Sequence, residues 1–202
     1  ITDMDEPLAS ACGNAVEVAN AVRFLRGEEI DARLWDVTVA LGGELLALCG
    51  LAGDAAEGRG RVAAAFEDGR AAERFGRMVA ALGGPADFLE RFEAHLPRAP
   101  VVMDAMAERE GVVGAVDGRA LGNAVVALGG GRTRPEDGVD LAVGLTEVAG
   151  LGAHVGPDFP LARVHARDAD AAREAVRRVR NAYIVTDRAP EPAEPVRARI
   201  GP

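Results

Sequence analysis

A proline-bracketed break at residues 97–100, Pro97-Arg98-Ala99-Pro100, most constrains the fold of this 202-residue chain. Proline fixes φ and disfavours helical geometry in the residue before it, so a helix cannot continue through the break. Before the break, apolar residues recur every three or four positions, as in amphipathic helices. After it, short apolar runs are bounded by turns, as in strands. We therefore expect two domains, residues 1–97 and 101–202, and an α/β (α+β) fold with a mostly helical first part.

The sequence pattern before the break predicts five helices. Turn residues Asp5 and Pro7 precede a helical stripe from Leu8 to Leu25, in which Cys12 and Ala15 take part. The second helix carries a broad apolar stripe from Leu34 to Leu48, which predicts burial on more than one side. The expected helices cover residues 8–25, 31–48, 54–66, 70–82 and 86–95.

The second part alternates short apolar runs with two helical patterns. A Pro/Glu-rich stretch, residues 189–195, predicts an extended tail that ends in one edge strand, residues 196–200. The other expected strands cover residues 101–107, 111–116, 141–145, 161–166 and 182–186, and the helices cover 117–128 and 168–180.

Composition excludes several classes of function. The formal net charge of −9 argues against nucleic acid or an anionic membrane as the main partner. All 23 basic residues are arginine, so this chain supplies no Schiff-base lysine, lysine general base or P-loop lysine. No apolar run reaches 18 residues, so we expect no membrane span. Cys12 and Cys49 lie in apolar helical patterns, and we expect buried free thiols in a reducing, cytoplasmic compartment.

Eight segments carry specific motifs along nearly the whole chain. They are Thr2–Leu8, Gly13–Val18, Asp68–Ala80, Gly84–Phe88, Arg119–Gly122, Val126–Arg132, Val143–Thr146 and Leu161–Ala166. In this order they resemble the C-terminal portion of the thymidine (pyrimidine-nucleoside) phosphorylase family. The resemblance implies the later part of a phosphorylase α/β domain, followed by a C-terminal subdomain that resembles an α/β hammerhead.

The resemblance also implies a reaction, the reversible phosphorolysis of thymidine to thymine and 2-deoxyribose 1-phosphate. The family enzyme is a homodimer whose ligands are phosphate and a pyrimidine nucleoside. Its phosphate loop and pyrimidine-binding residues belong to an N-terminal portion that no position here matches. The resemblance therefore assigns no catalytic and no cofactor-binding residue to this chain, and we expect the chain to be inactive alone.

A cation site is the one ligand site that the resemblance places on these residues. Family members hold a monovalent or divalent cation beside the helix that corresponds to residues 8–20. The ligands from this side correspond to the backbone carbonyls of Leu8 and Ala11 and to a carboxylate at the position of Asn20. Because an amide oxygen is uncharged, we expect a lower ion affinity with Asn20. The reaction itself requires no cofactor.

Other chemistry-bearing residues fit structural roles better. The Gly129–Arg132 run is interpreted as a helix end rather than an anion cradle. His95, His154 and His165 lack metal-ligand spacing, and His165, in an apolar strand pattern, is expected to be a hydrogen-bonded structural histidine. The arginine-rich face of residues 173–180 is interpreted as a solvated helix face.

The opening residue Ile1 is apolar and is not an initiator methionine, so we expect the chain to be a C-terminal piece of a longer protein. In that case the Leu34–Leu48 stripe would be exposed. Two alternatives stay open. The chain is a self-standing binding module that reuses the hammerhead fold, or it is one subunit of a split enzyme completed by a partner chain.

Overall fold

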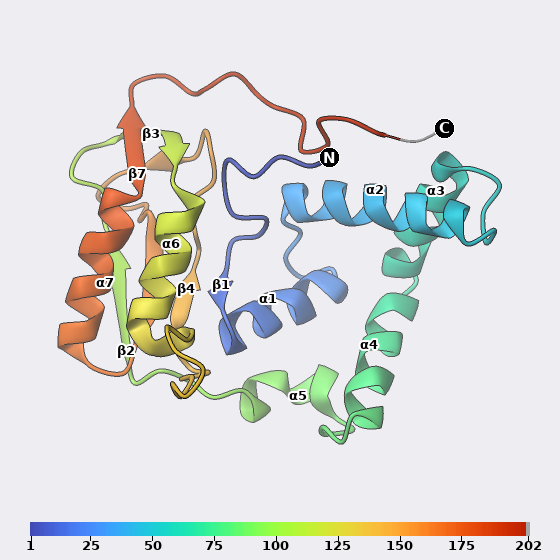
Figure 1. The fold of residues 1–202 in the computed structure, drawn as a ribbon, viewed down its shortest axis with the longest axis horizontal. Coiled ribbons are helices and arrows are strands. Elements are labelled where there is room, and N and C mark those ends of the chain that lie inside the picture. The colour runs from blue at the N-terminus through green and yellow to red at the C-terminus, as the bar shows by residue number, and fades with distance from the viewer. Residues whose placement is uncertain (201–202) are drawn as a thin grey trace. The chain divides into compact units, whose positions relative to one another are not determined.

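A computed structural model describes residues 1–200 of the chain, and Figure 1 shows its helices and strands. The chain divides into two compact units. The helical unit contains residues 1–3 and 19–95 and the tail from residue 194. The sheet unit contains residues 4–18 and 96–193. Each is described by itself below.

The helical unit is built from four whole helices and most of a fifth. Asp31 and Asp54 cap α2 and α3, each accepting a backbone N–H from the first turn. Phe24, Trp35 and Phe66 pack edge to face in its interior. The helices are α1 (Ala15–Leu25), α2 (Ala32–Leu48), α3 (Ala55–Glu67), α4 (Arg70–Ala81) and α5 (Phe88–His95).

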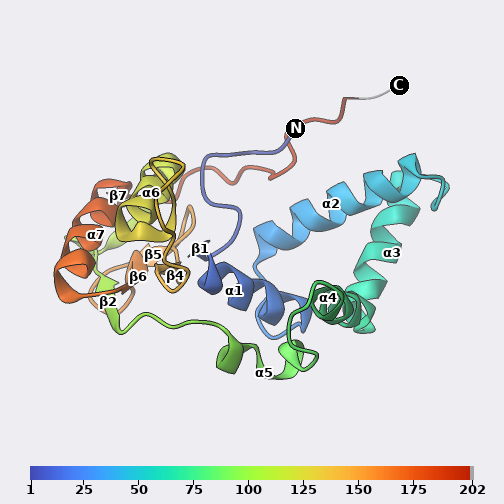
Figure 2. The same cartoon turned by 60° about the horizontal axis from the view of Figure 1, so that its bottom comes forward.

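Glycines set the distance between α2 and α3, which form the helical hairpin seen in Figure 2. Gly43 of α2 faces Gly58 of α3, and a Cβ on Gly58 would collide with the Gly43 carbonyl oxygen. The two backbones therefore approach each other more closely than any larger residue permits.

The sheet unit contains two antiparallel sheets. One has the strand order β1-β4-β6-β2 and the other β5-β3-β7. The strands are β1 (Cys12–Gly13), β2 (Val101–Ala105), β3 (Gly111–Val116), β4 (Gly144–Thr146), β5 (His154–Val155), β6 (Ala162–Ala166) and β7 (Tyr183–Thr186).

Two helices, α6 (Gly118–Val125) and α7 (Ala169–Asn181), lie side by side on this unit, as Figure 1 shows. A π-helical turn, Val126–Gly130, extends α6. Strand β6 alternates buried Ala162, Val164 and Ala166 with polar residues, and Val179 of α7 is buried in the same core. The alternating pattern of strand β6 and the helical pattern of α7 thus each place one face of their element in the core. The expected mixed α/β class is confirmed.

The first predicted helix begins later than expected. Residues 8–14 are not helical, and α1 starts at Ala15. The apolar spacing was misleading because Cys12 is in strand β1, opposite Leu145 of β4. Gly13 has a φ of 150° and lies against Gly144, a backbone arrangement that no helix accommodates.

Four further expectations are corrected. The predicted strand at 196–200 is a single bridge between Val196 and Thr2, and the strand expected at 141–145 begins at Gly144. Cys49 is exposed rather than buried, because it ends α2 as its C-cap. The burial expected on more than one side of α2 does not extend to the face that carries Leu41, Leu45 and Leu48, because these three side chains are exposed.

Candidate functional site

Residues 4–14, called the leading segment, run along the sheet unit before α1 begins. The backbone of Cys12 and Gly13 pairs with β4. The Ser10 carbonyl accepts the N–H of Val148 at 3.0 Å. The leading segment therefore supplies the edge strand of the four-stranded sheet, although some 130 residues separate it from β4 in sequence.

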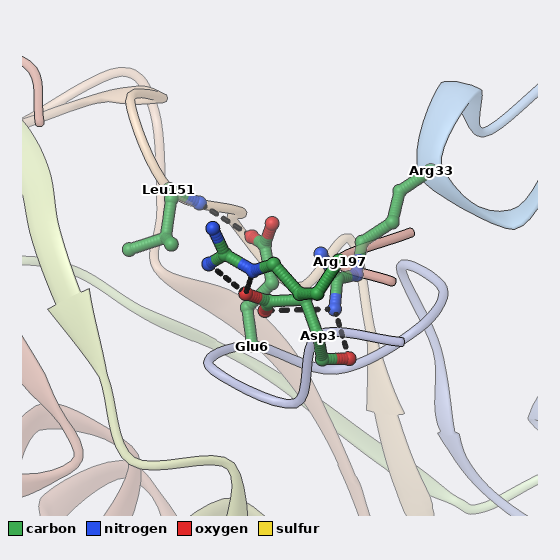
Figure 3. Close-up of polar contacts among 5 residues, drawn as sticks. All are labelled: Asp3, Glu6, Arg33, Leu151 and Arg197. Atoms are coloured by element: carbon green, nitrogen blue, oxygen red, sulfur yellow. Dashed lines mark hydrogen bonds and ion pairs between the residues drawn. The ribbon is translucent and has the colours of Figure 1, made fainter. Parts of the chain in front are cut away.

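The Glu6 carboxylate holds the turn that follows β4. Its Oε2 accepts the N–H of Leu151 at 2.6 Å, a bond drawn in Figure 3. A Cβ added at Gly150 would lie 2.8 Å from the same oxygen, so glycine leaves the room that Glu6 occupies. Tyr183 donates its hydroxyl to the Ala149 carbonyl at 3.0 Å. Burial, with the nearby charges of Cys12 and Glu6, raises the pKa of the Tyr183 hydroxyl.

The first turn of α1 is held by hydrogen bonds to other parts of the chain. Asn14 Nδ2 donates to the Gly130 carbonyl at 2.8 Å, and Glu17 Oε1 accepts the Gly13 N–H at 2.7 Å. The Ala15 N–H donates to the Leu141 carbonyl at 3.0 Å. Three of the sequence motifs, Gly13–Val18, Val126–Arg132 and Val143–Thr146, therefore meet at this point.

The glycine run after α6 is a helix end, as expected. Gly129 has a φ of 98°, in the left-handed region, and its carbonyl accepts the Asp140 N–H at 2.8 Å. The Gly130 carbonyl accepts from Asn14 as above. Because carbonyl oxygens line this helix end, it favours hydrogen-bond donors over anions as binding partners.

The predicted cation ligands lie in two kinds of structure. Leu8 and Ala11 are in the leading segment rather than on a helix, Leu8 exposed and Ala11 buried, and Asn20 is on α1. All three would offer neutral oxygen atoms, which suit a hard cation held weakly. Within residues 1–200, no cluster of three His, Cys, Asp or Glu side chains with metal-binding geometry occurs. The three ligands stay a prediction.

His165 is hydrogen-bonded, as expected for a structural histidine. Its Nε2 lies 2.8 Å from Thr146 Oγ1, across the β4–β6 pair. Burial, together with the positive charge of Arg163, lowers the pKa of His165. Arg163 itself contacts Asp104 at 2.8 Å and Glu147 at 2.9 Å. The polar side chains on this part of the sheet are thus hydrogen-bonded or ion-paired with one another.

Sequence reasoning did not assign roles to Asp3, Glu6 or Glu147. Asp3 binds two arginines that are distant in sequence, and Glu147 has a φ of 51°, which is uncommon for a residue other than glycine. Asp3 and Glu6 lie in the first motif, Thr2–Leu8, which the sequence marked only as a whole. Nothing in the sequence marks the strain at Glu147.

A hollow beside the start of α1 is lined by Gly13, Asn14, Glu17 and Leu141, among others. Its ionisable side chain, Glu17, is engaged by the Gly13 N–H. The hollow thus offers one amide side chain, Asn14, and one carboxylate, Glu17, and each is hydrogen-bonded to the backbone of the chain.

Comparisons with known proteins agree with the motifs. Residues 112–186 match the family model described as pyrimidine nucleoside phosphorylase C-terminal domain. The chain is 53% identical, over 185 residues, to thymidine phosphorylases of Burkholderia lata and Burkholderia cenocepacia. It is 52% identical over 187 residues to thymidine phosphorylase of Burkholderia orbicola.

These matches cover most of this chain and less than half of the relatives. The Burkholderia lata match takes in 92% of this chain and 42% of that protein. Identity at this level over both compact units leaves no room for chance resemblance. Over the C-terminal portion that it spans, the chain belongs to the thymidine (pyrimidine-nucleoside) phosphorylase family.

Proposed function

We propose that this chain forms the C-terminal portion of a thymidine phosphorylase. Such an enzyme catalyses the reversible reaction of thymidine with phosphate to give thymine and 2-deoxyribose 1-phosphate. The observation that carries the proposal is 53% identity over 92% of the chain to proteins of that name. A self-standing hammerhead module is not favoured, because the identity extends well beyond the matched residues 112–186.

The role of this chain is structural support for a site completed by other residues. Phosphorolysis needs a bound phosphate, stabilisation of a positively charged sugar and hydrogen bonds to the departing base. In the described residues, the leading segment is fixed by Glu6, Ser10 and β1, and α1 is fixed by Asn14 and Glu17. These contacts hold the leading segment and the start of α1 in place beside a site that the remaining part of the enzyme completes.

The cation belongs to the same proposal. Leu8 and Ala11 carbonyls and the Asn20 amide oxygen would hold a monovalent or divalent cation from this side, with other ligands supplied outside the chain. Restoring charge with Asn20→Asp should raise cation affinity in the complete enzyme, measured as the potassium concentration that gives half-maximal thermal stabilisation. Equal half-maximal concentrations in both proteins would remove Asn20 from the ligand set.

We also propose that the complete enzyme is a homodimer, as the family enzyme is, and that it is located in the cytoplasm. The net charge of −9 favours neither nucleic acid nor anionic lipid as a partner. None of the helices within residues 1–200 has the length and apolar character to cross a bilayer.

The test uses a fusion. The part of the Burkholderia lata protein that precedes the matched region is joined to Ile1 of this chain, and phosphate-dependent release of thymine from thymidine is measured. We expect turnover from the fusion and background release from this chain alone. Clear turnover by this chain alone would contradict its supporting role. A folded fusion without turnover would contradict the proposed function.

A further inference from the structure

The tail, residues 194–200, pairs with the first residues of the chain inside the helical unit. Val196 of the tail forms a single antiparallel bridge with Thr2. Next to this bridge, the Arg197 N–H donates to the Ile1 carbonyl at 2.9 Å. Even a complete two-stranded hairpin is only marginally stable in water, so a pairing this short needs further contacts to hold it.

Apolar burial contributes little to the attachment of the tail. Within residues 194–200, only Pro195 and Val196 are partly buried, and the side chain of Ile200 is 82% exposed. Residues 187–193, which lead into the tail, form neither helix nor strand. Because the hydrophobic effect is proportional to the apolar area removed from water, it does not account for the position of the tail.

Two arginines of the tail bind carboxylates of the helical unit. Arg197 Nε donates to Asp3 Oδ2 at 2.8 Å, and Nη2 of the same side chain donates to the same oxygen, as drawn in Figure 3. Arg199 Nε donates to Oε1 of Glu44, on α2, at 2.7 Å. Hydrogen bonds between ionised groups are about twice as strong as those between neutral groups. The tail is therefore attached mainly by charge.

Both arginines remain open to water and to salt ions. The side chain of Arg197 is 44% exposed and that of Arg199 is 62% exposed. Salt screens exposed charges more strongly than buried ones. Arg33 of α2 also binds Asp3, so this carboxylate keeps one arginine partner and gains water when Arg197 leaves. Separation of the tail therefore leaves no buried charge unpaired, and the helices need not unfold with it.

We propose that the tail is an ionic strap, which Arg197 and Arg199 fasten to Asp3 and Glu44, and which salt releases while the helices stay folded. Release uncovers the edge of the helical unit formed by residues 1–3, together with the Asp3 carboxylate. The inference goes beyond the proposed function and does not depend on it, because both partners of each ion pair lie in this chain.

Amide hydrogen exchange, followed residue by residue by NMR, tests the strap in this chain. Raising the NaCl concentration from about 0.1 M to about 1 M shortens the screening length from about 10 Å to about 3 Å. The Arg197 and Ala198 amides both donate to the Ile1 carbonyl, and their protection reports on the attached tail. We expect these two amides to exchange at least about fivefold faster at the higher salt concentration, with the amides of α3 changed less than about twofold.

Charge-reversal variants identify the ion pairs. Arg199→Glu should speed the exchange of the tail amides at the lower salt concentration, because it places two carboxylates opposite each other. Adding Glu44→Arg should restore slow exchange, because it forms the pair again with the charges reversed. Arg188→Glu, which makes the same change of charge outside the tail, is the matched control and should leave the exchange of the tail amides unchanged.

Three outcomes would overturn the strap. Exchange of the tail amides that does not respond to salt would show that the backbone pairing alone holds the tail. Loss of protection in α3 together with the tail would show that the tail leaves only when the helical unit unfolds. Equal exchange in Arg199→Glu and in the double variant would show that the pair with Glu44 does not fasten the tail.

Discussion

Asp3 shows how one residue ties three distant parts of the helical unit together. Its side chain is 4% exposed. Arg33 Nη2, at the start of α2, donates to the Asp3 carbonyl at 2.8 Å and to Oδ1 at 3.2 Å. Arg197, in the tail, donates through Nε to Oδ2 at 2.8 Å, and Figure 3 shows both arginines converging on the carboxylate. The Asp3 N–H also donates to the Pro195 carbonyl.

Removing this carboxylate should destabilise the helical unit. Asp3→Ala removes a buried carboxylate that binds Arg33, whose side chain is 14% exposed, and the loss of such a charged hydrogen bond costs about 1.5–3 kcal/mol. Urea unfolding followed by the fluorescence of Trp35 measures the effect. Glu73→Ala is the control, because its pair with Arg77 is exposed and contributes less than about 1 kcal/mol. Equal urea midpoints for the two variants would contradict a supporting role for Asp3.

The two cysteines differ in reactivity for a physical reason. Burial, with the negative charge of Glu17 adding to it, raises the pKa of the Cys12 thiol to about 11, and Cys49 is exposed at the end of α2. At pH 8 we expect two labelling phases with a disulfide reagent, the slow one at least tenfold slower. Cys12→Ala should remove the slow phase and Cys49→Ala the fast one. A single phase in the unmodified chain would refute this assignment.

His165 should make stability depend on pH in the mildly acidic range. Its pKa is lowered in the folded chain, so the unfolded chain takes up the proton first as the pH falls. The contribution is fully present above the ordinary value of 6.5 and is lost as the pH falls below it. His165→Asn keeps a polar group near Thr146 and removes the titration. Its urea midpoint should therefore fall less steeply between pH 7 and pH 5, and parallel profiles would contradict the prediction.

At the scale of elements, the closest packing is the α2–α3 crossing. Gly58→Ala puts a methyl group against the Gly43 carbonyl, and overpacking of this kind costs about 1–3 kcal/mol. Gly60→Ala on the same helix is the matched control, because nothing lies within 4 Å of its added Cβ. There alanine should stabilise α3 by up to about 1 kcal/mol. The two thermal unfolding midpoints should move in opposite directions, and a shift in the same direction would disprove the close crossing.

Periodicity located most elements because burial and local spacing agree there. The predictions for β3, α5 and α7 match the structure to within about two residues at each end, as expected for boundaries. Prediction did not succeed at residues 8–14, where Leu8 and Cys12 copy the helical spacing by coincidence. Their structure depends on pairing with β4, a contact that no local pattern records.

The candidate site was predictable only as motifs. The sequence marked Gly13–Val18, Val126–Arg132 and Val143–Thr146 separately, and the fold brings them together through Asn14 and the Gly13–Gly144 pair. The clamp of Glu6 on Leu151 joins positions 145 residues apart. Such long-range partners follow from the tertiary fold and not from spacing along the chain.

At the scale of the whole molecule, both compact units matter for the account. The sheet unit holds residues 112–186, which match the family domain, and α2 of the helical unit leaves Leu41, Leu45 and Leu48 exposed. The chain spans about two fifths of the length of the relatives it matches.

The catalytic efficiency of the fusion is the most direct test of this account. The kcat/KM for phosphate-dependent cleavage of thymidine is measured for the fusion and for the intact Burkholderia lata protein under the same conditions. Because the chain is 53% identical to that protein over 92% of its own length, we predict values within about tenfold of each other, a difference of about 1.4 kcal/mol in transition-state stabilisation. A folded fusion whose thymine release does not exceed the phosphate-free background would contradict the account.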